Sequence, residues 1–302
     1  MLSIVVLGTA AGGGVPQWNC GCANCRAARN GRPELQSTQA SIAVSADREH
    51  WFLVNASPDL RQQITETPAL HPRTGHLRQS PIAGVILTNG EVDAVAGLLS
   101  LRESTAFGLY AHQRVLDILR DNSIFNVLRS DLVPRRALPL NAPFALPLID
   151  GTPSGLTLEA FPVPGKIALF LEDETDNGEG DTVGLEIRDD TDGQRLVFLA
   201  ACAEVTSPIA DRLRGADLVF FDGTLWRDDE MIAAGLGSKT GKRMGHMAMS
   251  DTIPALAGLD IGKRVFLHIN NSNPALREDS PERRAAREAG WIVPADGMEI
   301  DL

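Results

Sequence analysis

Three cysteines lie within six residues near the N-terminus, at Cys20, Cys22 and Cys25. Thiolates spaced two and three residues apart on a turning backbone can converge on one metal ion, and a tetrahedral set of sulfur ligands favours zinc. Free thiols in a loop are the alternative, and they would be open to oxidation. Four protein ligands leave zinc no open position, so the spacing predicts a structural zinc in a loop at about residues 19–26.

The fourth zinc ligand must come from another part of the chain. Of the six histidines, His268 follows an apolar segment that predicts a strand, and it precedes the polar residues Asn270 and Asn271. A histidine at the end of a buried strand is held rigidly, which suits a metal ligand. We therefore predict His268 as the fourth ligand, while an active-site role or a purely hydrogen-bonded role for this histidine stays open.

Strand and helix patterns alternate along the rest of the chain. Segments 39–44 and 51–54 alternate in polarity around a charged turn and predict a hairpin, and Ser-Pro-Asp at 57–59 predicts the start of a helix. An apolar segment at 84–87 predicts a buried strand, followed by apolar spacing with helical period. Hairpins combined with interleaved helices favour an α/β (α+β) fold with a pair of mixed sheets covered by helices.

Three further segments carry expectations that depend on composition. Residues 109–128 have a helical pattern, the proline-rich segment 134–153 predicts irregular structure, and the acidic segment 172–181 predicts an exposed hairpin tip. Later strands are expected at 195–200, 218–221 and 264–267, with helices at 209–213, 251–257 and 281–289.

The length and the charge limit the classes of function. With 302 residues, of which 43% are hydrophobic, the chain can bury a large core, and we interpret residues 1–302 as one domain. A formal net charge of -11 argues against binding to nucleic-acid backbones. No Lys or Arg precedes the first apolar segment, and no apolar run approaches the roughly 20 residues of a membrane span, so we expect a cytoplasmic protein without membrane insertion.

Several longer motifs together resemble one protein family. They are LGTAAGGGVPQWNCGCANCRAAR, NASPDLRQQI, ILTNGEVDAVAGLLSLRE, FFDGTLW, GHMAMSD and LHINNSNP. These motifs span nearly the whole chain and resemble the PqqB family of pyrroloquinoline quinone (PQQ) biosynthesis, within the metallo-β-lactamase superfamily. More distantly, the N-terminal strand, glycine loop and cysteine cluster resemble the phosphodiesterase of the carbon–phosphorus lyase pathway. The resemblance implies an αββα sandwich.

The superfamily places a dinuclear metal site on an H-x-H-x-D-H motif between a strand and a helix. The matching positions here are Asn89, Glu91, Asp93 and Ala94, so only the aspartate remains. The later histidine turn is replaced by residues 162–165, and the usual bridging aspartate by residues 201–203. A standard di-zinc hydrolase is therefore not expected.

The resemblance leaves a second set of possible metal ligands, which are Glu91, Asp93, Asp222 and His246. Carboxylates joined by one or two histidines suit Fe(II), Mn(II) or Mg(II) better than a structural zinc. We assign catalytic roles to Asp93 and His246. The alternatives are that Asp93 and His246 each only cap the start of a helix.

Two functions follow from the resemblance. The first is metal-dependent hydroxylation, with iron as the expected metal, of a tyrosine-derived peptide precursor of PQQ. The second is a carrier without catalysis that assists transport of PQQ or its precursor toward the periplasm. The expected partners are a small-molecule or short-peptide precursor and other proteins of the pathway, and a homodimer stays open.

Overall fold

The computed structural model describes residues 1–172 and 177–302, and two seven-stranded sheets form its centre. The first sheet has the order β14-β1-β2-β3-β4-β5-β6, and the second has the order β13-β12-β11-β10-β9-β8-β7. The strands of the first sheet are β1 (Ser3–Gly8), β2 (Ser41–Ser45), β3 (Trp51–Val54), β4 (Ile82–Ile86), β5 (Gly108–Ala111), β6 (Arg135–Ala137) and β14 (Glu299–Asp301). Those of the second are β7 (Pro143–Pro147), β8 (Pro153–Pro162), β9 (Val183–Asp189), β10 (Arg195–Leu199), β11 (Ala216–Asp222), β12 (Ile261–Leu267) and β13 (Trp291–Ile292).

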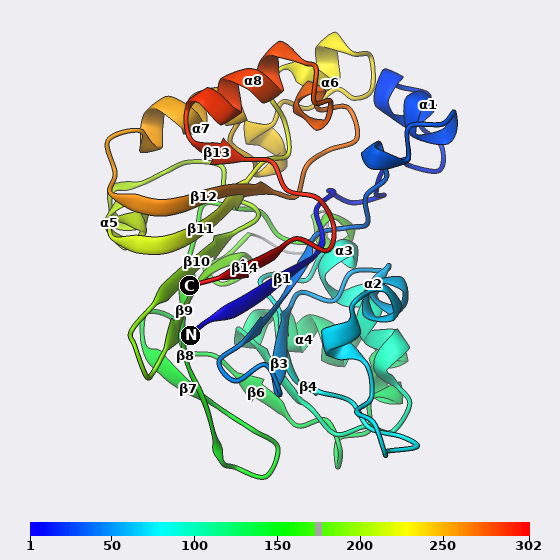
Figure 1. Ribbon diagram of the computed structural model, residues 1–302, viewed down its shortest axis with the longest axis vertical. Coiled ribbons are helices and arrows are strands. Elements are labelled where there is room, and N and C mark those ends of the chain that lie inside the picture. The colour runs from blue at the N-terminus through cyan, green and yellow to red at the C-terminus, as the bar shows by residue number, and fades with distance from the viewer. Residues whose placement is uncertain (173–176) are drawn as a thin grey trace.

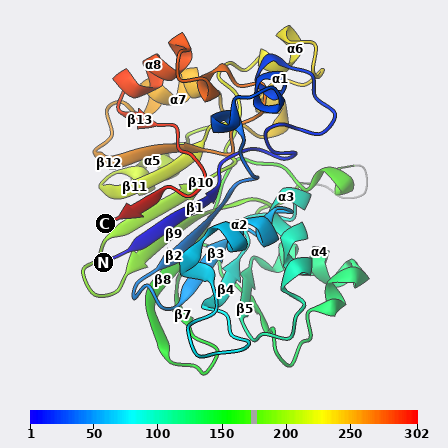
Figure 2. The same cartoon turned by 45° about the vertical axis from the view of Figure 1, so that its right-hand side comes forward.

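Helices cover the outer face of each sheet, which gives the predicted αββα sandwich (Figure 1). The helices α2 (Leu60–Glu66), α3 (Val92–Val95) and α4 (Gln113–Asp121) pack on the first sheet, and α5 (Ser207–Leu213), α7 (Met249–Leu256) and α8 (Pro281–Glu288) pack on the second. Two short helices, α1 (Ala23–Arg29) and α6 (Glu230–Ala233), lie near each other at one end of the molecule in both views (Figures 1 and 2).

Strand β1 illustrates how the sequence builds these layers. Its side chains alternate between the two faces of the sheet, so Ile4 and Val6 enter the core between the sheets, while Val5 and Leu7 enter the core under the helices. A strand that is buried on both faces reads as a continuous apolar run, which explains why the segment lacks alternation.

Two predicted segments differ from the structure. The first part of 109–128 forms strand β5, because Leu109 and Ala111 are buried against helices on one face and Tyr110 between the sheets on the other. A short strand buried on both faces cannot be told from a helix by periodicity. The proline-rich segment 134–153 contains β6 and β7, which are the last strands of their sheets, where proline is tolerated.

The predicted hairpin tip at 172–181 includes residues 173–176, which lie outside the described residues. At its end, Asp181 is buried and forms an ion pair of 2.6 Å with Arg114, so this part is not exposed. Among the helices of the described ranges, 1–172 and 177–302, none is both long enough and apolar enough to span a membrane.

The sheet topology brings several strand ends together. Strands β3, β4 and β5 are parallel neighbours, and so are β10, β11 and β12 in the other sheet. Parallel neighbours end at the same edge of a sheet, so the residues that follow them form a common rim. A bridge between Asn89 and Thr182 and another between Ala10 and Ile269 connect the loops of this rim.

Candidate functional site

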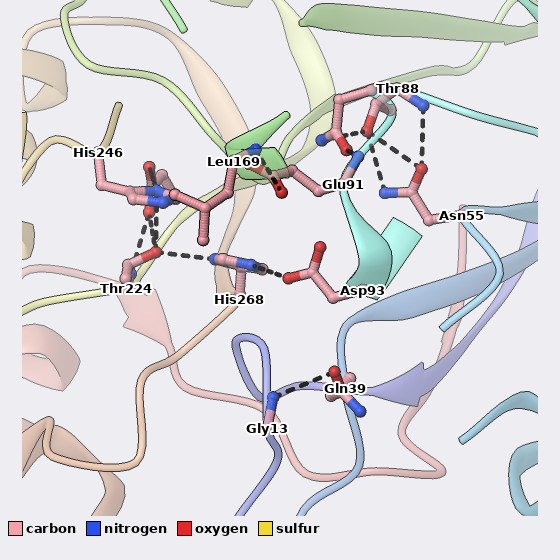
Figure 3. Close-up of polar contacts among 12 residues, drawn as sticks. Gly13, Gln39, Asn55, Thr88, Glu91, Asp93, Leu169, Thr224, His246 and His268 are labelled. Atoms are coloured by element: carbon pink, nitrogen blue, oxygen red, sulfur yellow. Dashed lines mark hydrogen bonds and ion pairs between the residues drawn. The ribbon is translucent and has the colours of Figure 1, made fainter. Parts of the chain in front are cut away.

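The central contact of the rim joins His268 to Asp93. His268 follows β12, Asp93 lies in the first turn of α3, and the His268 Nε2 atom is 3.0 Å from Asp93 Oδ2 (Figure 3). His268 has a φ of 59°, a left-handed conformation that is uncommon for residues other than glycine. Such backbone strain concentrates at functional sites, where the surroundings hold it in place.

Thr224 determines which nitrogen of His268 carries a proton. The Thr224 hydroxyl donates to Asp222 Oδ1 at 2.7 Å, so the same oxygen must accept from His268 Nδ1 at 2.9 Å. Nδ1 is therefore protonated, and Nε2 faces the Asp93 carboxylate. Either a second proton or a metal ion must lie between these two atoms, because a lone pair and a carboxylate repel each other.

The charges around His268 favour its protonated form. Burial acts to lower the pKa of His268, but the hydrogen bond with Asp93 and the negative charges of Asp93, Asp222 and Glu91 raise it overall. Burial acts to raise the pKa of Asp93, yet its contact with His268 lowers it overall. The negative charges that hold a proton on His268 also attract a divalent cation.

Asp222 and His246 form a second pair beside this one. Asp222 Oδ2 lies 2.7 Å from His246 Nδ1, and the rings of His246 and His268 stack with centroids 5.1 Å apart. One ligand atom from each of Asp222, His246 and His268 lies within 4.8 Å of the others, a spacing compatible with a metal ion.

Asp222 is better suited to orienting His246 than to binding a metal. Its Oδ1 accepts from the backbone and hydroxyl of Thr224, and its Oδ2 accepts from the backbone of Cys202 and from His246. These four contacts use the roughly four lone-pair positions of a carboxylate. Asp222 and Thr224 lie at Nδ1 of His246, so Nε2 is the atom that His246 can present to the cavity it lines.

The expected ligand Glu91 lines the same cavity but is engaged elsewhere. Its carboxylate accepts from the backbone of Leu169 at 3.1 and 3.2 Å (Figure 3). It also lies 3.4 Å from Lys166 Nζ. The three carboxylates expected to converge on one ion therefore do not do so. Asp93 contacts His268, Asp222 contacts His246, and Glu91 forms part of the wall.

These groups line a cavity of about 730 Å³, a volume within the usual range for small-molecule sites. Its walls combine apolar side chains such as Val92, Phe170 and Met244 with the charged ends of Lys166 and Lys239. The cavity can therefore accept a molecule with an apolar body and a few polar groups.

The cysteine cluster forms a separate site. One sulfur atom from each of Cys20, Cys22 and Cys25 lies within 4.8 Å of the others. Burial raises the pKa of Cys25 to about 11, so this thiol ionises readily only beside a cation. Cys22 caps helix α1 by accepting from the backbone of Cys25, which helps to set the turn that brings the sulfur atoms together.

The structure places Asn271, and not His268, beside these sulfur atoms. Asn271 Nδ2 is 3.2 Å from Cys25 Sγ and 3.6 Å from Cys22 Sγ, and the Asn271 carbonyl oxygen is 3.4 Å from Cys22 Sγ. Both ring nitrogens of His268 face Thr224 and Asp93 instead. The prediction that His268 completes the cysteine site is corrected accordingly, because the loop places its ring in the cavity and brings Asn271, three positions later, to the cysteines.

Two positions of the superfamily motif lack a ligand here. Asn89 lines the cavity and accepts from the backbone of Glu91 at 2.9 Å, which shapes the loop before α3. Ala94 is buried in the core under the helices and does not line the cavity. The site thus keeps the aspartate of the motif, Asp93. Its two imidazoles, His246 and His268, come from other parts of the chain.

Two supporting residues, Thr88 and Gln39, were not predicted, whereas Asn55 and Asp59 are candidate cleft residues from their place in the sequence after the second hairpin strand. The backbone N–H of Thr88 donates to Asn55 Oδ1 at 2.9 Å (Figure 3). This hydrogen bond fixes the start of the loop that carries Asp93. Gln39 accepts from the backbone of Gly13 at 3.1 Å and donates to Asp59. These two hydrogen bonds hold the glycine loop, residues 12–14, against the cavity. The turn residues Asn55 and Thr88 follow apolar strands in the sequence, and that position is the only signal they give.

The donor set fits a divalent metal. Asp93 Oδ2 and His268 Nε2, which lie 3.0 Å apart, would hold the metal. Mixed imidazole and carboxylate donors suit first-row transition metals. The three thiols suit zinc.

A family model described as Beta-lactamase superfamily domain matches residues 50–269, and with the two stacked sheets it places the chain in the β-lactamase superfamily. Within it, the chain is 62% identical to coenzyme PQQ synthesis protein B of Rhodopseudomonas palustris (strain TIE-1) and 60% identical to that of Bradyrhizobium diazoefficiens, over 100% of each chain. A crystal structure of Zn²⁺-bound PqqB from Methylobacterium extorquens has 49% identity and a TM-score of 0.93, covering 99% of this chain and 100% of that one.

The chain therefore belongs to the coenzyme PQQ synthesis protein B family, a family of PQQ biosynthesis. This result confirms the family resemblance and the fold expected from the motifs. The Zn²⁺ named for the solved relative, together with the histidine–aspartate group, supports a divalent metal in this chain.

Proposed function

We propose that the chain acts in PQQ biosynthesis as an iron-dependent hydroxylase of a tyrosine-derived peptide precursor. The observation that carries this proposal is the pair of donor atoms, Asp93 Oδ2 and His268 Nε2, 3.0 Å apart beside a cavity of about 730 Å³. A small ligand set leaves open coordination positions, which O₂ chemistry requires. The apolar walls suit a phenol ring.

The reaction inserts one oxygen atom of O₂ into the ring and releases the other as water. It therefore consumes two electrons and two protons, which an added reductant such as ascorbate supplies in the test. Iron held by Asp93 and His268 would supply the redox chemistry.

We infer that His246 moves a proton of the substrate. Asp222 holds the Nδ1 side of the ring, so Nε2 can accept a proton from a phenol bound in the cavity, and the carboxylate stabilises the resulting imidazolium. Asp93 and His268 are fixed by α3 and by Thr224, so they keep their positions while substrate enters.

The test is O₂ consumption by the protein reconstituted with Fe(II) under anaerobic conditions and then mixed with ascorbate and a glutamyl-tyrosine peptide. We expect uptake of O₂ in proportion to the hydroxylated product, and loss of both in Asp93→Ala. Asp131→Ala is the matched control, because Asp131 lies at the surface in an ion pair with Arg129, outside the cavity. O₂ uptake without product, or equal product from Asp93→Ala, would exclude the hydroxylase.

The carrier alternative has its own support in the chain. Asn89 and Ala94 occupy motif positions where the superfamily has histidines, so fewer metal ligands remain. A protein that binds the precursor with unchanged affinity after removal of metal and never oxidises it would be a carrier.

A further inference from the structure

The chain has only four lysines, Lys166, Lys239, Lys242 and Lys263, and two of them line the central cavity. Lys166 lies in the loop after β8, and Lys239 lies in the loop after α6. In a protein with a net charge of -11, two ammonium groups beside one cavity create a local site for an anion.

A single carboxylate brings these two lysines together. Glu172 Oε1 lies 2.9 Å from Lys166 Nζ, and Glu172 Oε2 lies 3.1 Å from Lys239 Nζ. Burial acts to lower the pKa of Lys166, but Glu172 and Glu91 raise it overall, so the ammonium stays charged. The two lysines lower the pKa of Glu172.

The hold of Glu172 on the lysines is weak enough to be exchanged. The side chains of Lys166, Lys239 and Glu172 are 29%, 42% and 29% exposed, and ion pairs that reach solvent contribute little free energy. Lysine is a flexible point charge, whereas arginine would bind the carboxylate with two fixed hydrogen bonds. An incoming carboxylate that also buries apolar surface can therefore replace Glu172.

The neighbouring side chains indicate what that carboxylate belongs to. Val92, Leu169 and Phe170 line the same cavity and are 57%, 60% and 44% exposed. Large apolar groups left open at a cavity gain free energy when a ligand covers them. A ligand that satisfies both features has an aromatic or apolar body with an acidic group attached.

We propose that Lys166 and Lys239 form a binding site for a carboxylate of an aromatic substrate, and that Glu172 occupies this site until the substrate displaces it. This assignment deepens the proposed function, on which it rests for the identity of the cavity as a substrate site. It assigns substrate specificity to two residues that lie outside the metal-binding pair.

The test measures binding without turnover, so that it does not depend on hydroxylation. The zinc-loaded protein is titrated under argon with glutamyl-tyrosine and with glutaminyl-tyrosinamide, which has a similar shape and lacks both carboxylates. We expect wild type to prefer the acid, and Lys239→Met to lose roughly tenfold in affinity for the acid alone, as for a lost charged hydrogen bond. Lys242→Met, whose lysine pairs with Glu204 on the surface, is the matched control and should bind like wild type.

Glu172→Gln tests the displacement step. It removes the competing charge, so the affinity for the acid should rise about threefold, the size expected for a partly exposed ion pair. Equal binding of acid and amide, or equal affinities in Lys239→Met and Lys242→Met, would overturn the assignment, as would failure of every variant to bind the acid. Acid-selective binding without later O₂ uptake would instead keep the assignment and remove the hydroxylase.

Discussion

The side-chain amide of Asn24 donates to the carbonyl oxygen of Asn271 at 3.0 Å, which joins the cysteine loop to the loop that begins at His268. The same amide also donates to the carbonyl oxygen of Asn273 at 2.9 Å. The cysteine site and the central cavity are thus connected through one short loop, because that loop carries His268 at one end and Asn271 near the other.

Asn24→Ala should therefore weaken both sites. It removes two buried hydrogen bonds, which costs about 0.5–1.5 kcal/mol for each bond, and it frees the loop to move. We expect faster release of zinc from the cysteines and weaker metal binding at His268, measured by chelator competition. Asn30→Ala, at the exposed end of α1, is the control, and unchanged release in Asn24→Ala would show that the two loops are independent.

Cys22→Ser should lose zinc and stability together. Metal binding and folding of the loop are coupled, so we expect loss of one zinc per chain and a fall in melting temperature on the order of 5 °C. Metal analysis and calorimetry check these changes. Cys202→Ala removes a buried thiol outside the cluster and should keep its zinc, whereas a Cys22→Ser protein that melts like wild type would contradict a structural role.

His268→Ala and Asn271→Ala should have opposite effects on the two sites. The geometry places Asn271, and not His268, against the sulfur atoms, so His268→Ala should retain the cysteine-bound zinc and Asn271→Ala should release it more readily. Zinc retention after dialysis against a chelator is the measurement. Loss of that zinc from His268→Ala would restore the prediction made from the sequence.

Asp93→Asn should remove metal from the cavity and leave the cysteine site intact. Loss of a ligand should weaken metal binding by roughly 100-fold or more, since removal of supporting residues alone costs 10- to 100-fold. Titration with Mn(II) followed by electron paramagnetic resonance measures the affinity. Glu91→Gln should bind Mn(II) nearly as wild type does, and an equal loss in both variants would return Glu91 to the ligand set.

Asp222→Asn should disturb His246 without removing the metal. The carboxylate accepts four hydrogen bonds, and an amide must turn one N–H toward a donor, so we expect a loss of stability of about 1–3 kcal/mol in urea unfolding. The ¹⁵N signals of His246 should show a changed tautomer. A protein that folds normally and loses its cavity metal would identify Asp222 as a ligand instead.

Local patterns in the sequence determined much of this protein. The cysteine cluster could be predicted because its three residues lie within six consecutive positions, where spacing alone brings the sulfur atoms together. The hairpin of β2 and β3 and the start of α2 could also be predicted from short-range signals. Strand β5 could not, because burial on both faces removed the pattern that separates strand from helix.

Tertiary structure decided which of the predicted residues belong to the cysteine site and which belong to the central cavity. His268 meets Asp93 across 175 positions of sequence, and Asn24 meets Asn271 across 247, and no periodicity encodes such contacts. The direction of each side chain at a strand end depends on the twist of two sheets and on the left-handed turn at His268. The sequence therefore identified the residues that could bind metal, and the packing of the two sheets determined which of them share a site.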